Sequence, residues 1–160
     1  CSSDLQWFAP DQPVGPNTAR FQGQLGSRLT FIDGFAAGGG FQLSRGISAL
    51  AGDRNGTGYQ LRYDEGTRAV LLTADASYDL IEPTMLAGVG SLTIPHHGGL
   101  SLVPPPPAMQ PHRAIASFGL PNRYRHPDQT TLSNHANGKW QVASTAAWQS
   151  MPRGDRILFP

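Results

Sequence analysis

The chain has 160 residues, which is the size of one domain with one hydrophobic core. Glycine (19) and proline (14) are frequent and predict many turns and long loops. A formal net charge of +1 argues against a basic nucleic-acid-binding surface over the whole molecule, but it leaves room for a local basic patch.

The only cysteine, Cys1, begins the sequence, so no intramolecular disulfide can form. A mature bacterial lipoprotein begins with cysteine, and "CSSD" is consistent with such a start, although a fragment boundary is the plainer interpretation. No stretch reaches the roughly 18 apolar residues of a membrane span, and no signal peptide is recognisable.

The first 52 residues are weakly patterned. Residues 5–10 ("LQWFAP") predict a short strand that ends at Pro10, and residues 36–40 ("AAGGG") predict a flexible segment outside the core. The clearer pattern covers residues 53–150, which we interpret as the motif-bearing core of a single domain.

From residue 57 onward the pattern predicts strands and helices in the order β-β-α-β-β-α-β. The predicted strands are 57–63, 68–75, 91–94, 113–119 and 140–146, and the predicted helices are 77–90 and 126–139. The first two strands form a hairpin whose second strand is buried on both faces. Pro83 has to lie in the first turn of its helix or break it, and Gly138 ends the last helix. This order predicts a layered α/β fold.

Polar side chains follow three of these strands. Asp75 ends the 68–75 strand, and His96 and His97 follow the 91–94 strand. After the 113–119 strand come Asn122, Tyr124 and His126. Ligands of layered α/β proteins collect at strand ends, and carboxylates with imidazoles suit Zn²⁺ or Mn²⁺. Two ions bridged by a carboxylate can activate a water for attack on a phosphorus or carbonyl centre.

Each group also has a simpler interpretation. Asp75 also fits a plain strand-end residue, the histidine pair fits an exposed turn, and His126 fits the cap of the following helix. The loop residues Asn122 to Arg125 also fit a solvated loop, and His112 and His135 are expected at the surface. Only the order and spacing of the three groups together favour a site.

The stretches "AVLLTADA", "LTIPHHGGLS" and "AIASFGLPNRYRHP" resemble the C-terminal half of the metallo-β-lactamase fold. The resemblance is closest to the hydrolase domains of the DNA-internalisation competence protein type, and it runs from about residue 55 to about residue 145, including "NGTGYQLRY". In that family one strand ends in Gly-Asp, another leads to His-His-Gly-Ser, and a third to Asn-x-Tyr-Gly-His-Pro. The fold it implies is a layered αββα sandwich, of which this chain would be the C-terminal half.

The resemblance implies a role for each matching position. Asp75 is the bridging metal carboxylate, His97 is a metal ligand, and His96 contacts substrate or acts in acid-base chemistry. His126 belongs to the substrate side of the cleft together with Asn122, Tyr124, Arg123 and Arg125, of which the arginines suit a phosphate anion. The implied cofactor is Zn²⁺ or Mn²⁺, dinuclear in the complete site.

The sequence departs from the family pattern at Ala74, Gly99 and Arg125, where the family has Gly, Ser and Gly. The family's His-x-His-x-Asp-His motif is also missing, because the first histidine is His96. We therefore expect the N-terminal half of the site in cis or from another chain. Because a catalytic zinc site has three protein ligands and a water, this chain alone should bind metal weakly and catalyse poorly.

The interpretation we favour is a metal-dependent hydrolase that acts on phosphodiester, nucleic-acid-like substrates through a metal-activated water. The alternative is a degenerate, non-catalytic module that binds a partner and is lipid-anchored through Cys1. A lactonase or β-lactamase-like enzyme of the same fold is a third interpretation, and the Asn-x-Tyr-x-His-Pro motif weighs against it.

Overall fold

The structure is a computed structural model that describes residues 6–32, 34–50, 52–101, 103, 105–106 and 112–158. Cys1 and part of the proline run 104–107 lie outside the described residues. The strands are β1 Trp7–Ala9, β2 Leu29–Phe31, β3 Phe35–Gly38, β4 Phe41–Arg45, β5 Tyr59–Glu65, β6 Arg68–Leu72, β7 Val89–Thr93, β8 Arg113–Ala116 and β9 Gln141–Ser144. The helices are α1 Pro16–Leu25, α2 Pro83–Leu86 and α3 Gln129–Asn137, with 3₁₀ turns η1 Gly26–Arg28, η2 Tyr78–Leu80 and η3 Pro95–Gly98.

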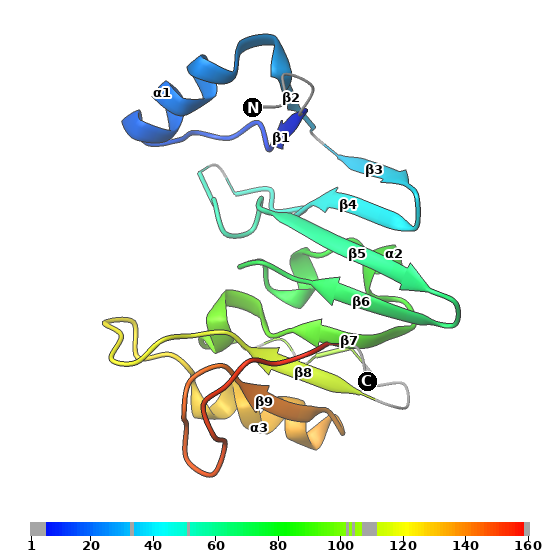
Figure 1. Ribbon diagram of the computed structural model, residues 1–160, viewed down its shortest axis with the longest axis vertical. Helices are drawn as coiled ribbons and strands as arrows, with labels where there is room; N and C mark the ends of the chain where they lie inside the picture. The colour runs from blue at the N-terminus through cyan, green and yellow to red at the C-terminus, as the bar shows by residue number, and fades with distance from the viewer. Residues whose placement is uncertain are drawn as a thin grey trace.

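A mixed sheet of seven strands, β3 to β9 in chain order, is the centre of the fold (Figure 1). The strands from β3 to β6 pair antiparallel, and those from β6 to β9 pair parallel. The parallel part needs crossover connections, which contain α2 between β6 and β7 and α3 between β8 and β9. The predicted α/β class is confirmed at this level. Because β6, β7 and β8 run parallel, their carboxyl ends meet at one edge of the sheet.

The predicted order of elements from β5 to β9 is confirmed, with one change in the 77–90 segment. This segment is not one helix but the 3₁₀ turn η2 followed by the single turn α2, which begins at Pro83. Glu82 before it is extended (φ −50°, ψ 128°), because proline disfavours a helical conformation in the residue that precedes it. Helix α3 begins after Asp128, whose side chain accepts a 3.0 Å hydrogen bond from the Thr131 amide, and Gly138 ends it as predicted.

The N-terminal part contains elements that the sequence pattern did not predict, namely α1, β2, β3 and β4. β1 and β2 form a separate parallel pair, connected by α1 (Figure 1). Tyr59 of β5 ties this unit to the main sheet, because its hydroxyl donates to the Ile32 carbonyl (2.9 Å) and accepts from the Ile32 amide (3.2 Å). Residues 36–40, predicted to be flexible, form the end of β3 and the turn after it.

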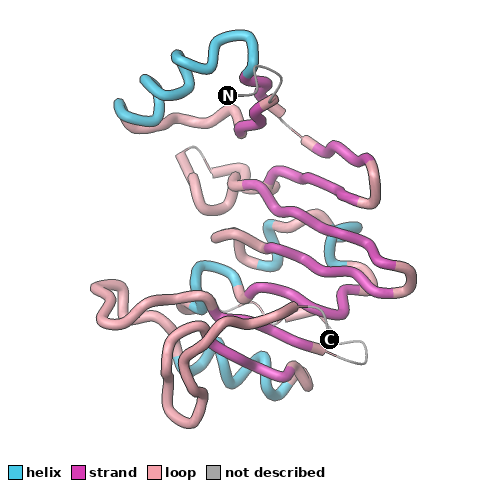
Figure 2. Tube along the Cα trace, in the orientation of Figure 1, coloured by secondary structure: helices cyan, strands magenta, loops and turns pink. Residues whose placement is uncertain are grey.

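The core lies on one face of the main sheet, where α2 and α3 pack (Figure 2). It contains Leu71 of β6, Leu92 of β7 and Ala114 of β8, together with Met85 of α2 and Leu132 of α3. The opposite face of β4, β5 and β6 is also apolar. We call it the open face and define it by the residues that the strand register aligns there: Phe41, Leu43, Leu61, Tyr63, Val70 and Leu72.

The open face is only partly covered in the described part of the chain. Phe41 is 49% exposed and Leu72 is 39% exposed. The segment that follows β9 crosses the sheet in front of β8, at a distance from β4 and β5 (Figure 1). No helix within the described residues is both long and apolar enough to span a membrane.

The prediction that His112 and His135 lie at the surface is wrong, since they are 4% and 1% exposed. His135 faces the core from α3, with Nε2 2.7 Å from the Tyr78 hydroxyl and Nδ1 2.7 Å from the Thr131 carbonyl oxygen. Both ring nitrogens thus have partners, which makes a buried imidazole tolerable. Burial lowers the pKa of both histidines and raises the pKa of Tyr78.

Candidate functional site

Four of the residues predicted from the sequence come together where β6, β7 and β8 end. The ring of His96 lies 5.0 Å from that of His126 and 6.4 Å from that of His97, measured between centroids. The His97 and His126 rings are 6.5 Å apart. Asp75 joins them, because its Oδ1 is 3.9 Å from Nε2 of His97. We call Asp75, His96, His97 and His126 the histidine cluster.

The turn that carries the two adjacent histidines has an uncommon backbone. Both His96 (φ 49°, ψ 45°) and His97 (φ 57°, ψ 23°) are left-handed, which costs roughly 1–2 kcal/mol per non-glycine residue. Backbone hydrogen bonds hold the turn, from the His96 amide to the Ala74 carbonyl (3.0 Å) and from the Asp128 amide to the Gly98 carbonyl (2.7 Å). Strained backbone of this kind persists where the surroundings fix it, and it is concentrated at functional sites.

Gly99 lets the rings of the cluster approach each other. A Cβ atom at this position would lie 2.7 Å from Cε1 of His126 and 2.9 Å from Cδ2 of His96. The backbone of Gly99 is extended (φ −61°, ψ 169°), so any residue could adopt it and only space excludes a side chain. A larger side chain at position 99, such as serine, would meet the same two imidazoles.

His97 is oriented by a backbone carbonyl. Its Nδ1 lies 2.8 Å from the carbonyl oxygen of Ser117, which can only accept a hydrogen bond. The neutral ring therefore carries its proton on Nδ1 and keeps a lone pair on Nε2, the atom that faces Asp75. Since the side chains of His97 and Asp75 are 60% and 43% exposed, a solute can reach this pair. A carbonyl partner on the far nitrogen is the usual support of a histidine metal ligand.

His126 lies on the other side of His96, in a loop that Asn122 braces. The Asn122 side chain accepts from the His126 amide (2.9 Å) and donates to the carbonyls of His126 (2.8 Å) and Gly119 (2.9 Å). Burial lowers the pKa of His126, and the neighbouring His96 and His97 lower it further, against the opposite effect of Asp75. Asn122 thus shapes the loop, and its contact with substrate stays a prediction.

The rest of this loop is exposed. The ring of Tyr124 stacks on that of His126 (centroids 5.8 Å, planes 15° apart), and the Arg123 guanidinium lies 4.8 Å from the Tyr124 centroid. Arg125 is left-handed (φ 59°), at the position where the family has glycine. That Arg123 and Arg125 bind phosphate stays a prediction.

Asn55 belongs to the site and was not among the predicted site residues. It lies in the loop between β4 and β5, and its Nδ2 is 3.1 Å from Nδ1 of His96. The one sequence signal was its place at the start of "NGTGYQLRY", which resembles the family's strand. The contact joins residues 41 positions apart, which a local pattern does not reveal.

The cluster fits a metal ion in the type of its donors but not in their number. Asp75 and His97 are a carboxylate oxygen and an imidazole nitrogen, as Zn²⁺ and Mn²⁺ prefer. Their 3.9 Å separation is somewhat wider than the roughly 3.3 Å between two ligands of a tetrahedral zinc ion. Over the part of the chain that the structure describes, no group of three or more His, Cys, Asp or Glu side chains is arranged to hold a metal ion.

A hollow of about 350 Å³ connects the cluster with the open face. Asp75, His97 and Ser117 line one part of it, and Leu43, Leu61 and Leu72 of the open face line another. A segment that covered the open face would therefore also reach the carboxylate and the imidazole.

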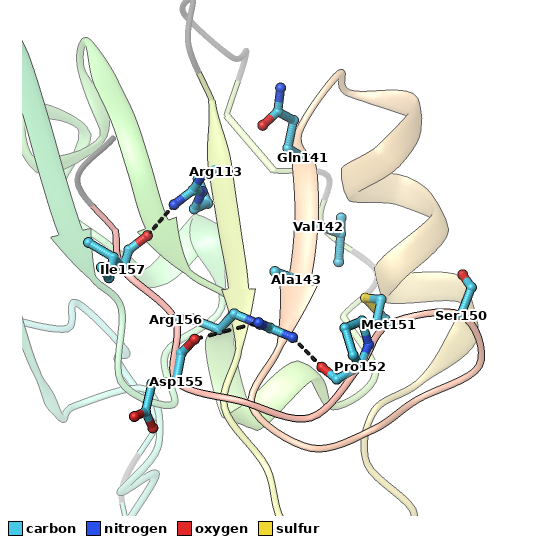
Figure 3. A pocket seen from close by; sticks show the side chains of 10 residues that line it. All are labelled: Arg113, Gln141, Val142, Ala143, Ser150, Met151, Pro152, Asp155, Arg156 and Ile157. Atoms are coloured by element: carbon cyan, nitrogen blue, oxygen red, sulfur yellow. Dashed lines mark hydrogen bonds between the residues drawn. The ribbon is translucent and has the colours of Figure 1, made fainter.

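A second hollow, of about 510 Å³, lies between β8, β9 and the segment that follows β9 (Figure 3). Its two arginines donate to backbone carbonyls, Arg113 to Ile157 (2.6 Å) and Arg156 to Ser144 (2.8 Å). The Asp155 carboxylate points away from the Arg156 guanidinium (Figure 3). These arginines hold the C-terminal segment against the sheet, and the lining contains no histidine.

No family model, no curated protein and no solved structure matches this chain. Its function is therefore inferred from the geometry of the cluster and from the motif resemblance.

Proposed function

We propose that this chain carries part of the active site of a metal-dependent hydrolase of the metallo-β-lactamase fold, which acts on phosphodiesters such as nucleic acid. The observation that carries the proposal is the pair of His97 and Asp75, with Nε2 facing the carboxylate and Nδ1 held by the Ser117 carbonyl. A strand-end carboxylate beside an imidazole supported in this way is a typical partial metal site.

Asp75 and His97 would hold Zn²⁺ or Mn²⁺, and the bound ion would supply an activated water as the nucleophile. His96 and His126 border the pair, with ring centroids 6.4 Å and 6.5 Å from that of His97, and would face the reacting groups of a substrate. The depressed pKa of His126 keeps its imidazole neutral near pH 7, so that it can accept a proton or a hydrogen bond. Arg123 and Arg125 would attract the phosphate.

The remaining metal ligands would come from a segment that packs on the open face, in cis or from another chain. With that segment in place the domain would be a complete layered αββα sandwich, and this architecture is part of the proposal. It is supported by helices that cover only one face of the sheet between β4 and β6, and by the hollow that runs from the open face to Asp75. Burial of Phe41 and Leu72 would favour such packing by the hydrophobic effect.

The first experiment is calorimetry of the chain with Zn²⁺ and Mn²⁺, beside an Asp75→Asn, His97→Gln double variant. Asp79→Asn is the matched control, since Asp79 is an exposed carboxylate in η2, outside the histidine cluster. We expect weak binding that the double variant loses and the control keeps. Equal binding by all three proteins would remove the basis of the proposal.

The second experiment follows hydrolysis of bis(p-nitrophenyl) phosphate by the metal-loaded protein, with a lactone and a β-lactam as comparison substrates. Turnover of the phosphodiester with a higher KM after Arg123→Gln and Arg125→Gln supports the assigned substrate class. Turnover of only the lactone or only the β-lactam would instead support a lactonase or a β-lactamase-like enzyme of the same fold.

The alternative is a non-catalytic module that binds a partner. One observation favours it, namely that no three His, Cys, Asp or Glu side chains among the described residues are arranged to hold a metal ion, whereas a catalytic zinc site usually has three protein ligands. Metal binding at Asp75 and His97 without turnover of any of the three substrates is the result that this alternative predicts.

A further inference from the structure

Two neighbouring histidines of the cluster have opposite kinds of hydrogen-bond partner on the same ring nitrogen. Nδ1 of His97 faces a carbonyl oxygen, that of Ser117, at 2.8 Å. Nδ1 of His96 faces the amide nitrogen of Asn55 at 3.1 Å. A carbonyl oxygen only accepts a hydrogen bond, and an amide NH₂ only donates one.

The partner decides which nitrogen of a neutral imidazole carries the proton. For His97 the proton has to be on Nδ1, so Nε2 is a lone pair. For His96 the proton has to be on Nε2, because Nδ1 accepts from Asn55. We propose that Asn55 is a positioning residue that holds His96 in the Nε2–H tautomer, opposite to His97, so that the adjacent rings offer one hydrogen-bond donor and one acceptor to the same ligand.

The loop that carries Asn55 is built to hold it in place. The Asp53 carboxylate accepts from the Gly56 amide (2.9 Å), and the Asp53 carbonyl accepts from the Thr57 hydroxyl (2.7 Å). A hydrogen bond with the Ser48 side chain is the main cause of a lowered pKa of Asp53, and the hydrogen bond from the Gly56 amide is the next. The Asp53 carboxylate therefore stays a charged acceptor at neutral pH.

The two ends of the same loop pack against each other. A Cβ at Gly46 would lie 2.1 Å from the Gly56 carbonyl oxygen, so this approach requires glycine. The Ile47 amide donates to the Leu80 carbonyl of η2 at 2.9 Å, which anchors the loop to the main body. Asn55 is itself exposed, and none of these bonds uses its side chain, so within the described part of the chain its amide group is left to contact His96.

The opposite tautomers suit a phosphodiester, which is the part of the inference that rests on the proposed function. An N–H group hydrogen-bonds an anionic phosphate oxygen, whereas a lone pair in the same place would repel it. The lone pair of His97 is the form that a metal ligand needs. The tautomers themselves follow from Asn55 and Ser117 alone.

The test is long-range ¹H–¹⁵N correlation NMR of the metal-free chain, which shows directly which ring nitrogen is protonated. Spectra are recorded over a series of pH values, and the tautomers are assigned where the signals of the two rings no longer change as the pH rises. His96→Gln and His97→Gln assign the two rings. We expect Nε2–H for His96 and Nδ1–H for His97.

The variant that tests Asn55 is Asn55→Asp, which replaces the donor by a carboxylate that only accepts. We expect the His96 proton to move from Nε2 to Nδ1 while His97 stays unchanged. Asn17→Asp in α1 is the matched control, because it makes the same change at an exposed position far from the cluster in sequence, and it should leave both tautomers as they are.

Two results would overturn the proposal: an Nδ1–H tautomer of His96 in the unaltered chain, or an unchanged His96 tautomer in Asn55→Asp. Because the measurement needs neither metal nor turnover, a failure of the hydrolase proposal and a failure of this one appear in different experiments.

Discussion

A side chain at Gly99 should displace the rings of the histidine cluster. In Gly99→Ala the new Cβ would lie 2.7 Å from His126, 2.9 Å from His96 Cδ2 and 3.0 Å from the His96 carbonyl oxygen. The backbone of Gly99 suits alanine, so the full effect is steric. Overpacking of this kind costs about 1–3 kcal/mol, and we expect a loss near the middle of that range because one of the contacts is with backbone.

The assay is urea unfolding of Gly99→Ala beside Gly119→Ala. Gly119 lies in the neighbouring loop, and a Cβ there would meet nothing within 4 Å, so its free energy of unfolding should change by less than about 0.5 kcal/mol. Nuclear Overhauser contacts between the rings of His96 and His126 should weaken only in Gly99→Ala. If the two variants are equally stable and both keep these contacts, the rings of His96 and His126 are not packed against Gly99 as described.

Two further predictions concern stability. Ala74→Gly should stabilise the protein by roughly 0.5–1 kcal/mol, because the left-handed conformation of Ala74 (φ 50°) costs about 1–2 kcal/mol and the greater backbone entropy of glycine offsets part of the gain. Thermal unfolding measures the change in stability. Ala136→Gly inside α3 is the control and should lose roughly 1 kcal/mol, and a loss of similar size in Ala74→Gly would contradict the prediction. Burial holds the pKa of His135 below its ordinary value of about 6.5, so below about pH 6.5 the unfolded chain binds more protons than the folded one. The free energy of unfolding therefore falls as the pH drops through this range, by at most ~1.4 kcal/mol per pH unit for this residue. Urea unfolding between pH 7.5 and about 5 should give a flatter profile for His135→Gln, and parallel profiles would show that His135 does not titrate in this way.

The strands from β5 to β9 could be predicted because their patterns are local. Tyr59, Leu61 and Tyr63 alternate on one face, and the apolar run of β6 is flanked by a turn and an acid. Helix α1 could not be predicted, because among its ten residues only Leu25 is buried and no apolar stripe marks it. β3 is the edge strand and only four residues long, and the alternation of β4 (Phe41 and Leu43 against Gln42 and Ser44) covers too few residues to stand out from a loop.

The members of the histidine cluster could be predicted to lie together, but their contacts with residues outside the cluster could not. Asp75, His96, His97 and His126 each follow a strand, so parallel pairing was enough to bring them together. His135 finds its buried partner in Tyr78, 57 residues away, and His96 contacts Asn55 across 41 residues. Such pairs leave no periodic signal in the sequence, because each residue taken alone is of a type that is common in surface loops or helices.

The three positions at which the sequence departs from the resembling pattern, Ala74, Gly99 and Arg125, differ in backbone conformation. At Ala74 and Arg125 the backbone is left-handed (φ 50° and 59°), a conformation that favours glycine, so this chain carries a side chain there at the cost of strain. At Gly99 the backbone is extended, so the glycine reflects space, which the rings of His96 and His126 fill. A serine at position 99 would therefore meet the His96 and His126 rings, although the backbone there would accept it. If the cluster binds a ligand as proposed, the contacts among its rings and the contact of Asn55 with His96 set the geometry of the binding site.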